Sequence, residues 1–177
     1  MFCDIHLPDG SPFPGDPRYI LKRNLQRAAA LGFTFYVGPE VEFFYFKDSE
    51  ATTTLDQGGY FDLTPIDLGE DVRREIVLAL EQMGLHVEAA HHEVAPGQHE
   101  VDFRSDDAIT TADNISTFRF VVKNVAVRNN LHATFMPKPI FGINGSGMHT
   151  HQTLLSKGKN AFYSASNEWH LNPVGLG

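Results

Sequence analysis

The chain has 177 residues, of which 42% are hydrophobic, and this is enough for one compact unit with a sizeable core. Its 22 acidic and 14 basic residues give a net charge of -8, which argues against nucleic acid or an anionic membrane surface as a partner and suits a metal cation. The single cysteine, Cys3, cannot form an internal disulfide, and its apolar neighbours predict that it is buried. Because no apolar run approaches a membrane span and the first residues lack a signal-peptide pattern, we expect a cytoplasmic protein.

The first third of the chain predicts a helix and a long strand. Residues 1–7 alternate weakly, which indicates a short strand. Asp16 as a cap and Pro17 at the first helical position predict a helix that continues until Gly32. Residues 33–46 are strongly apolar and extended in pattern, which is typical of a strand.

The middle of the chain predicts a loop, a second helix and a hairpin. Residues 47–59 are polar and Thr-rich, which indicates an exposed loop or hairpin without a functional signal of its own. Asp67, with Glu70 three residues later, has the pattern of a helix cap and its capping box. Strands over residues 85–93 and 99–103 are separated by a Pro-Gly turn, as in a hairpin.

The last part predicts one helix and two strands around a loop. The helix covers residues 111–128, the strands cover 131–136 and 148–155, and the intervening residues 137–147 are rich in Gly, Pro and Asn. Strands and helices do not alternate regularly, and the joins resemble hairpins. The order therefore favours an α+β fold with a largely antiparallel sheet.

Two carboxylates on the long strand are the first candidates for chemistry. Glu40 and Glu42 alternate with apolar residues, so both side chains point to the same face of the strand. Like charges side by side on an apolar strand are costly unless a cation lies between them. The alternative is a solvated edge strand on which glutamates only discourage aggregation.

Two further carboxylates, Glu93 and Glu100, flank the predicted hairpin turn. If the hairpin pairs beside the strand that carries the first two, three or four carboxylates converge with a histidine close by. Such a donor set suits Mg²⁺ or Mn²⁺ better than Zn²⁺. The alternatives are polar residues on an edge strand and, for His149 and His151, ordinary half-buried histidines of the core.

Five motifs together resemble the bacterial type I family of glutamine synthetases. In the family's order they are Gly38-Pro39-Glu40-Val41-Glu42-Phe43-Phe44, Gly59-Tyr60-Phe61-Asp62-Leu63, His91-His92-Glu93-Val94-Ala95-Pro96-Gly97-Gln98-His99-Glu100, Lys138-Pro139 and Asn144-Gly145-Ser146-Gly147-Met148-His149. The resemblance implies an ATP-dependent ligase of glutamine biosynthesis and nitrogen metabolism, which phosphorylates the side-chain carboxylate of glutamate and lets ammonia displace the phosphate. It also implies a curved sheet with helices packed on one face.

The resemblance further implies roles for individual residues. Glu42, Glu93 and Glu100 match the ligands of a Mg²⁺ or Mn²⁺ site near the glutamate, and Glu40 and His149 match those of a second site near the phosphates of ATP. The other matched positions bind substrates: Asn144 and Gly145 the glutamate, and Glu88, Phe103, His151 and Thr153 the nucleotide.

Family members have a small β-grasp domain before the position of Met1 and further catalytic residues after the position of Gly177, so we expect residues 1–177 to be a partial catalytic domain that is inactive alone. By resemblance the parent protein forms a homo-oligomeric ring, a dodecamer. Two alternatives stay open: a γ-glutamyl-amine ligase that accepts a polyamine or another amine, and a noncatalytic member with a structural or interaction role.

Overall fold

The computed structural model describes residues 2–50, 52–166 and 168–173. Residues 1, 51, 167 and 174–177 of the predicted domain, 1–177, lie outside the described residues. The chain divides into two compact units. Unit 1 consists of Met1–Val37, Ser105–Asp113 and Gln152–Gly177, and unit 2 consists of Gly38–Arg104 and Asn114–His151. Each unit is described by itself.

Unit 1 contains helix α1 (Pro17–Ala30), whose start was predicted correctly. The Asp16 carboxylate accepts a hydrogen bond from the Arg18 backbone N–H at 3.0 Å, and Gly32 follows the helix at a φ of +85°. The predicted strand over residues 1–7 is wrong for the described residues, where the backbone forms only an isolated bridge between His6 and Pro12. Cys3 is exposed, contrary to the prediction from its apolar neighbours.

Short strands complete unit 1. Strand β4 (Asp106–Asp107) pairs with the start of β1 (Phe33–Phe46), and β7 (Lys159–Asn160) pairs with the end of β6 (Met148–Ser156). Helix α3 (Ala108–Arg128) begins three residues before the predicted position. The reason is Asp107, whose carboxylate accepts from the backbone N–H groups of Ile109 and Thr110 at 3.1 Å each and so caps the helix earlier.

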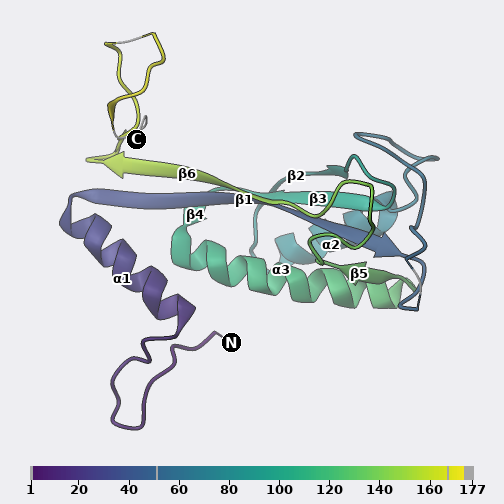
Figure 1. The fold of residues 1–177 in the computed structure, drawn as a ribbon, viewed down its shortest axis with the longest axis horizontal. Coiled ribbons are helices and arrows are strands. Elements are labelled where there is room, and N and C mark those ends of the chain that lie inside the picture. The colour runs from purple at the N-terminus through teal and green to yellow at the C-terminus, as the bar shows by residue number, and fades with distance from the viewer. Residues whose placement is uncertain (1, 51, 167, 174–177) are drawn as a thin grey trace. The chain divides into compact units, whose positions relative to one another are not determined.

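Unit 2 contains the antiparallel strands that were predicted. Strands β2 (Val87–His92) and β3 (Gln98–Phe103) form the hairpin, and β3 pairs with β1. Strand β5 (His132–Thr134) also pairs with β1, at its C-terminal end. Figure 1 shows β1, β2 and β3 side by side, with helix α2 (Glu70–Gln82) and the adjoining length of α3 on one face. The α+β fold with a largely antiparallel sheet is therefore confirmed.

The core of unit 2 lies between this sheet and its helices. Every second residue of β1 and β3 faces the helices and is buried: Val41, Phe43, Tyr45, Val101 and Phe103. From the helices, Ile76, Leu80, Phe118, Val122 and Val125 fill the other side. The periodicity of α3 predicted this buried face. Among the described residues, no helix is both long and apolar enough to cross a membrane.

Helix α2 begins later than predicted, because Asp67 does not cap it. The Asp67 side chain is buried and pairs with Arg73 at 2.8 Å, and Gly69 occupies the capping position without a side-chain bond. The Glu70 carboxylate does not close a capping box and accepts instead from Thr64. Thus the capping-box prediction was wrong: Asp67 Oδ2 pairs with the buried Arg73, and Asp67 Oδ1 accepts from the N–H of Gly69, the residue before the first helical turn, at 2.9 Å.

Candidate metal and substrate site

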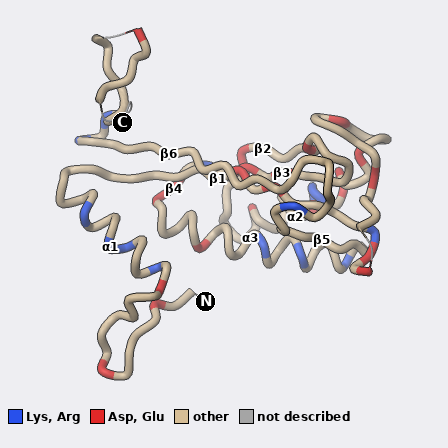
Figure 2. Tube along the Cα trace, viewed as in Figure 1, with Lys and Arg blue, Asp and Glu red and all other residues tan. Residues whose placement is uncertain are grey.

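The register of β1 and β3 places acidic side chains opposite one another. Glu42 lies across from Glu100, and Glu40 lies across from Asp102. Because the residues between them face the helices, these carboxylates point to the other face of the sheet. Figure 2 shows acidic positions gathered where β1, β2 and β3 run side by side.

A cavity of about 450 Å³ opens on this face of unit 2. It is lined by four glutamates, Glu40, Glu42, Glu93 and Glu100, together with His149. Within the part of the chain that the structure describes, the lining contains no Lys or Arg. Four carboxylates and an imidazole thus share one cavity without a protein cation to neutralise them.

Three of these carboxylates form the tightest group. One oxygen each from Glu42, Glu93 and Glu100 lies within 4.8 Å of the others, and all three residues are buried. Glu40, Glu100 and His149 form a second group, in which one ligand atom of each residue lies within 4.8 Å of the other two. Glu100 belongs to both groups, so the two candidate metal positions adjoin each other.

The environment of Glu100 makes its ionised form unfavourable. Burial, followed by the hydrogen bond with Glu93 and the negative charges of Asp102, Glu93 and Glu42, raises the pKa of Glu100 to about 9. The carboxyl therefore holds a proton at neutral pH unless a cation takes its place. An all-oxygen donor set with one adjacent imidazole fits Mg²⁺ or Mn²⁺.

The loop before β6 holds the Glu42 carboxylate in place. The Gly147 backbone N–H donates to Glu42 Oε2 at 2.9 Å, and the Glu42 N–H donates to the Gly147 carbonyl at 3.1 Å. A Cβ atom on Gly147 would lie 2.9 Å from Glu42 Oε1, so a larger residue would require the Glu42 carboxylate to shift. Gly145 is more tightly constrained, because its Cβ would collide with the backbone carbonyl oxygen of Pro137, which cannot move aside as a side chain can.

Gln98 connects the carboxylates to the same loop, and the sequence analysis missed it. Its Nε2 donates to Glu42 Oε2 and to the Gly145 carbonyl, the latter at 2.9 Å. Gln98 is only 1% exposed. The signal that could have found it is alternation along β3, which puts residue 98 on the same face as Glu100.

Two histidines of β6 orient Glu40. His151 Nε2 lies 2.6 Å from Glu40 Oε1, and His149 Nδ1 lies 3.1 Å from Glu40 Oε2. The hydrogen bond from His151 lowers the pKa of Glu40, against the raising effect of burial and with help from His149. As the alternation of β6 predicted, these two histidines share a face.

The family described as "Glutamine synthetase, catalytic domain" matches residues 14–176. The chain belongs to the glutamine synthetase family. It is 58% identical to the glutamine synthetase of Thermus thermophilus, over 99% of this chain and 41% of that protein. It is 57% identical to that of Clostridium saccharobutylicum, over 98% of this chain and 40% of that protein. The chain thus spans about two fifths of the length of the curated relatives it matches.

Solved structures of this family share the fold. A Plasmodium falciparum glutamine synthetase superposes with a TM-score of 0.89 at 27% identity, over 98% of this chain and 41% of that one. A protein named GmaS, solved without ligand, gives a TM-score of 0.88 at 36% identity, over 97% of this chain and 42% of that one. GmaS has also been solved in complex with ADP.

The substrate positions implied by the resemblance to glutamine synthetase are distributed unevenly. Asn144 and Gly145 line the cavity beside the carboxylates. Glu88 is exposed on β2, and Phe103 belongs to the core, with its ring 5.1 Å from that of Phe118; neither residue lines the cavity. Thr153 is half-buried and belongs to unit 1.

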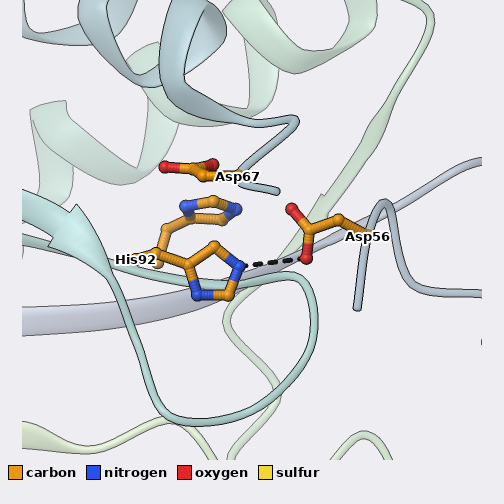
Figure 3. Close-up of side chains that lie close together, drawn as sticks. Asp56, Asp67 and His92 are labelled. Atoms are coloured by element: carbon orange, nitrogen blue, oxygen red, sulfur yellow. Dashed lines mark hydrogen bonds and ion pairs between the residues drawn. The ribbon is translucent and has the colours of Figure 1, made fainter. Parts of the chain in front are cut away.

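A buried polar network, also missed from the sequence, lies on the helix-facing side of the same strands. His92 Nε2 is 3.0 Å from Asp56 Oδ1 (Figure 3), and His92 Nδ1 is 2.7 Å from the Glu93 carbonyl oxygen. Both partners accept, so His92 carries a proton on each nitrogen. Burial, the largest single effect, lowers the pKa of His92, but the hydrogen bonds to Asp56 and to the Glu93 carbonyl and the charges of Asp56 and Asp67 together raise it. Burial raises the pKa of Asp56, but the hydrogen bonds from His92, Gly97 and Gly58 together have a larger effect and hold this pKa below its usual range.

Arg73 completes the network and fixes the neighbouring histidine. Its guanidinium pairs with Asp67 and donates to His99 Nδ1, both at 2.8 Å. Burial and the nearby charge of Arg73 hold the pKa of His99 well below its usual range. Because Nδ1 accepts, the proton of neutral His99 lies on Nε2, which has no hydrogen-bond partner among the described residues.

Proposed function

We propose that this chain forms the metal-binding and glutamate-binding part of a glutamine synthetase, which joins ammonia to the side-chain carboxylate of glutamate through a γ-glutamyl phosphate made from ATP. The observation that carries the proposal is the convergence of Glu42, Glu93 and Glu100 in one cavity without a protein cation, in a chain of this family.

The carboxylates divide into two ligand sets in this proposal. Glu42, Glu93 and Glu100 hold one Mg²⁺ or Mn²⁺ near the glutamate, and Glu40 and His149 hold a second near the phosphates of ATP. The raised pKa of Glu100 supports this assignment, since a divalent cation relieves the repulsion that keeps its proton in place. When bound, such ions offset the negative charge that gathers between the terminal phosphate of ATP and the carboxylate of glutamate.

The neighbouring residues hold this arrangement rigid. Asn144 and Gly145 present the loop that binds glutamate, and Gln98 ties that loop to Glu42 through one amide group. His149 and His151 fix the orientation of Glu40. We assign the binding of the nucleotide, by family resemblance, to Glu88, Phe103, His151 and Thr153. The ADP complex of the similar protein GmaS supports a nucleotide substrate.

A γ-glutamyl-amine ligase is the second candidate, because it would use the same metal ligands with an amine in place of ammonia. The test measures phosphate release by the full-length protein that contains this chain, with ATP and glutamate plus either ammonia or a polyamine. We expect ammonia to be the preferred acceptor and Glu42→Gln to abolish turnover. A strong preference for the polyamine would contradict the glutamine synthetase proposal and support the amine ligase. No turnover with either acceptor would favour the noncatalytic alternative.

The quaternary structure and cellular location belong to the same proposal. We infer a homo-oligomeric ring, a dodecamer, in the cytoplasm, by family resemblance. Light scattering on the full-length protein checks the first part, since a monomer or dimer would contradict it. The 177-residue chain, which spans about two fifths of its relatives, is expected to bind metal without forming glutamine.

A further inference from the structure

Asp56 is a buried carboxylate in the loop between β1 and α2, a loop that its composition predicted to be exposed. It accepts from four donors. Oδ1 accepts from the Gly58 N–H at 3.1 Å, the Gly97 N–H at 2.9 Å and His92 Nε2 at 3.0 Å, and Oδ2 accepts from the Leu68 N–H at 3.1 Å. A surface carboxylate of a flexible loop would not be enclosed in this way.

These four bonds join the turn of the hairpin to the segment between β1 and α2. Gly97 lies in the turn between Glu93 and Glu100. Its φ is +67°, a conformation that favours glycine, and a Cβ atom there would lie 2.9 Å from the Tyr45 carbonyl oxygen. Gly58 and Leu68 belong to the segment between β1 and α2, whose Tyr60 lines the cavity. One carboxylate therefore sets the spacing between the hairpin and this segment.

His92 carries the constraint from Asp56 to a metal ligand. While His92 Nε2 is hydrogen-bonded to Asp56, His92 Nδ1 donates to the backbone carbonyl of Glu93 at 2.7 Å. The Glu93 N–H donates in turn to the Gln98 carbonyl at 2.8 Å, and Gln98 contacts Glu42. The backbone that aims the Glu93 carboxylate is thus held on both sides.

The same cluster could be read as another metal site, since Asp56, Asp67, His92 and His99 lie within 4.8 Å of one another. The guanidinium of Arg73 argues against this, because it already occupies Asp67 and the Nδ1 atom of His99. Three donors already bond Oδ1 of Asp56, and one bonds Oδ2. A supporting role fits these contacts better than cation binding.

We propose that Asp56 is a positioning residue for the metal centre: by bonding Gly97, Gly58, Leu68 and His92 together, it holds the Glu93 and Glu100 carboxylates at the separation that a divalent cation needs. This inference rests on the proposed function, because it takes Glu42, Glu93 and Glu100 to be the metal ligands. Groups that orient metal ligands in this way typically change metal affinity by about 10- to 100-fold when they are removed.

The test compares Mn²⁺ binding by the 177-residue chain, by Asp56→Asn and by Leu80→Ala, using calorimetry for the affinity and electron paramagnetic resonance for the symmetry of the bound ion. Asparagine cannot accept at both side-chain atoms and carries no charge for His92. Leu80 is fully buried in the core and provides the matched control for a general loss of stability. We expect Asp56→Asn to weaken Mn²⁺ binding about tenfold or more and to change the spectrum, with Leu80→Ala within about twofold of the parent chain.

The inference is overturned if folded Asp56→Asn binds Mn²⁺ with the parent affinity and spectrum, or if Leu80→Ala weakens binding as much. Should Asp56→Asn not fold, Asp56→Glu decides by the same criterion, because it keeps the charge but displaces the oxygens by one methylene. Absence of saturable binding by the parent chain is a different result: it removes the metal centre of the proposed function, and the inference with it.

Discussion

Binding of a divalent cation to this chain should release a proton from Glu100. With a pKa of about 9, this carboxyl is almost fully protonated at neutral pH in the metal-free chain. A metal ligand must be deprotonated, so binding and proton loss are coupled. For one proton, the apparent affinity for Mn²⁺ should rise about tenfold for each pH unit between about pH 6 and about pH 8.

The assay is calorimetric titration with Mn²⁺ in two buffers of different ionisation enthalpy, which counts released protons directly. We expect about one proton per Mn²⁺ at pH 7 for the parent chain. Glu100→Gln should bind more weakly and release close to none, because the amide has no proton to give up. An affinity that does not change with pH, together with no proton release by the parent chain, would refute the reasoning.

The same shift predicts how the stability of the metal-free chain depends on pH. The pKa of Glu100 in the folded chain lies above its ordinary value of 4.5. The contribution of Glu100 to stability is therefore fully present below pH 4.5 and is lost as the pH rises towards about 9. The melting temperature should fall over this range and fall less in Glu100→Gln, and Mn²⁺ should restore it. A parent chain and variant with parallel curves would contradict this.

Three further substitutions test the packing around the site. Gly147→Ala places a methyl group 2.9 Å from Glu42 Oε1 and should weaken Mn²⁺ binding about tenfold in calorimetry; unchanged affinity would mean that the loop yields freely. Arg73→Met leaves Asp67 buried without its partner and should reduce the free energy of unfolding in urea by about 3–5 kcal/mol, a loss that adding Asp67→Asn should partly reverse. Phe118→Ala empties a fully buried position and should cost about 3–5 kcal/mol in the same assay, and a loss below about 1 kcal/mol would argue against the packing of α3 on the sheet.

Strand and helix patterns predicted the elements that carry the site. The alternation of β1 put Glu40 and Glu42 on one face and the hairpin pattern put Glu93 and Glu100 near them, because a period of two fixes which side chains share a face. What pattern alone left open was whether the hairpin pairs beside β1. The register that aligns Glu42 with Glu100 depends on contacts between segments far apart in the chain.

The buried network could not be predicted from local sequence. Asp56 stands in a polar segment whose composition indicates an exposed loop, and its burial depends on donors from residues up to 41 positions away. Asp67 resembled a helix cap because capping is a local pattern, whereas its pairing with Arg73 depends on how α2 packs. Composition and spacing describe neighbours along the chain, and these residues are defined by neighbours in space.

The most direct measurement of the central claim is a calorimetric titration of the 177-residue chain with Mn²⁺ beside its Glu42→Gln variant. Glu42 is buried, and one of its oxygens lies within 4.8 Å of those of Glu93 and Glu100. We predict saturable binding by the parent chain that the variant loses or weakens strongly, with both proteins folded by circular dichroism. Equal binding by the two proteins, or binding by neither, would contradict a metal centre built on these three carboxylates.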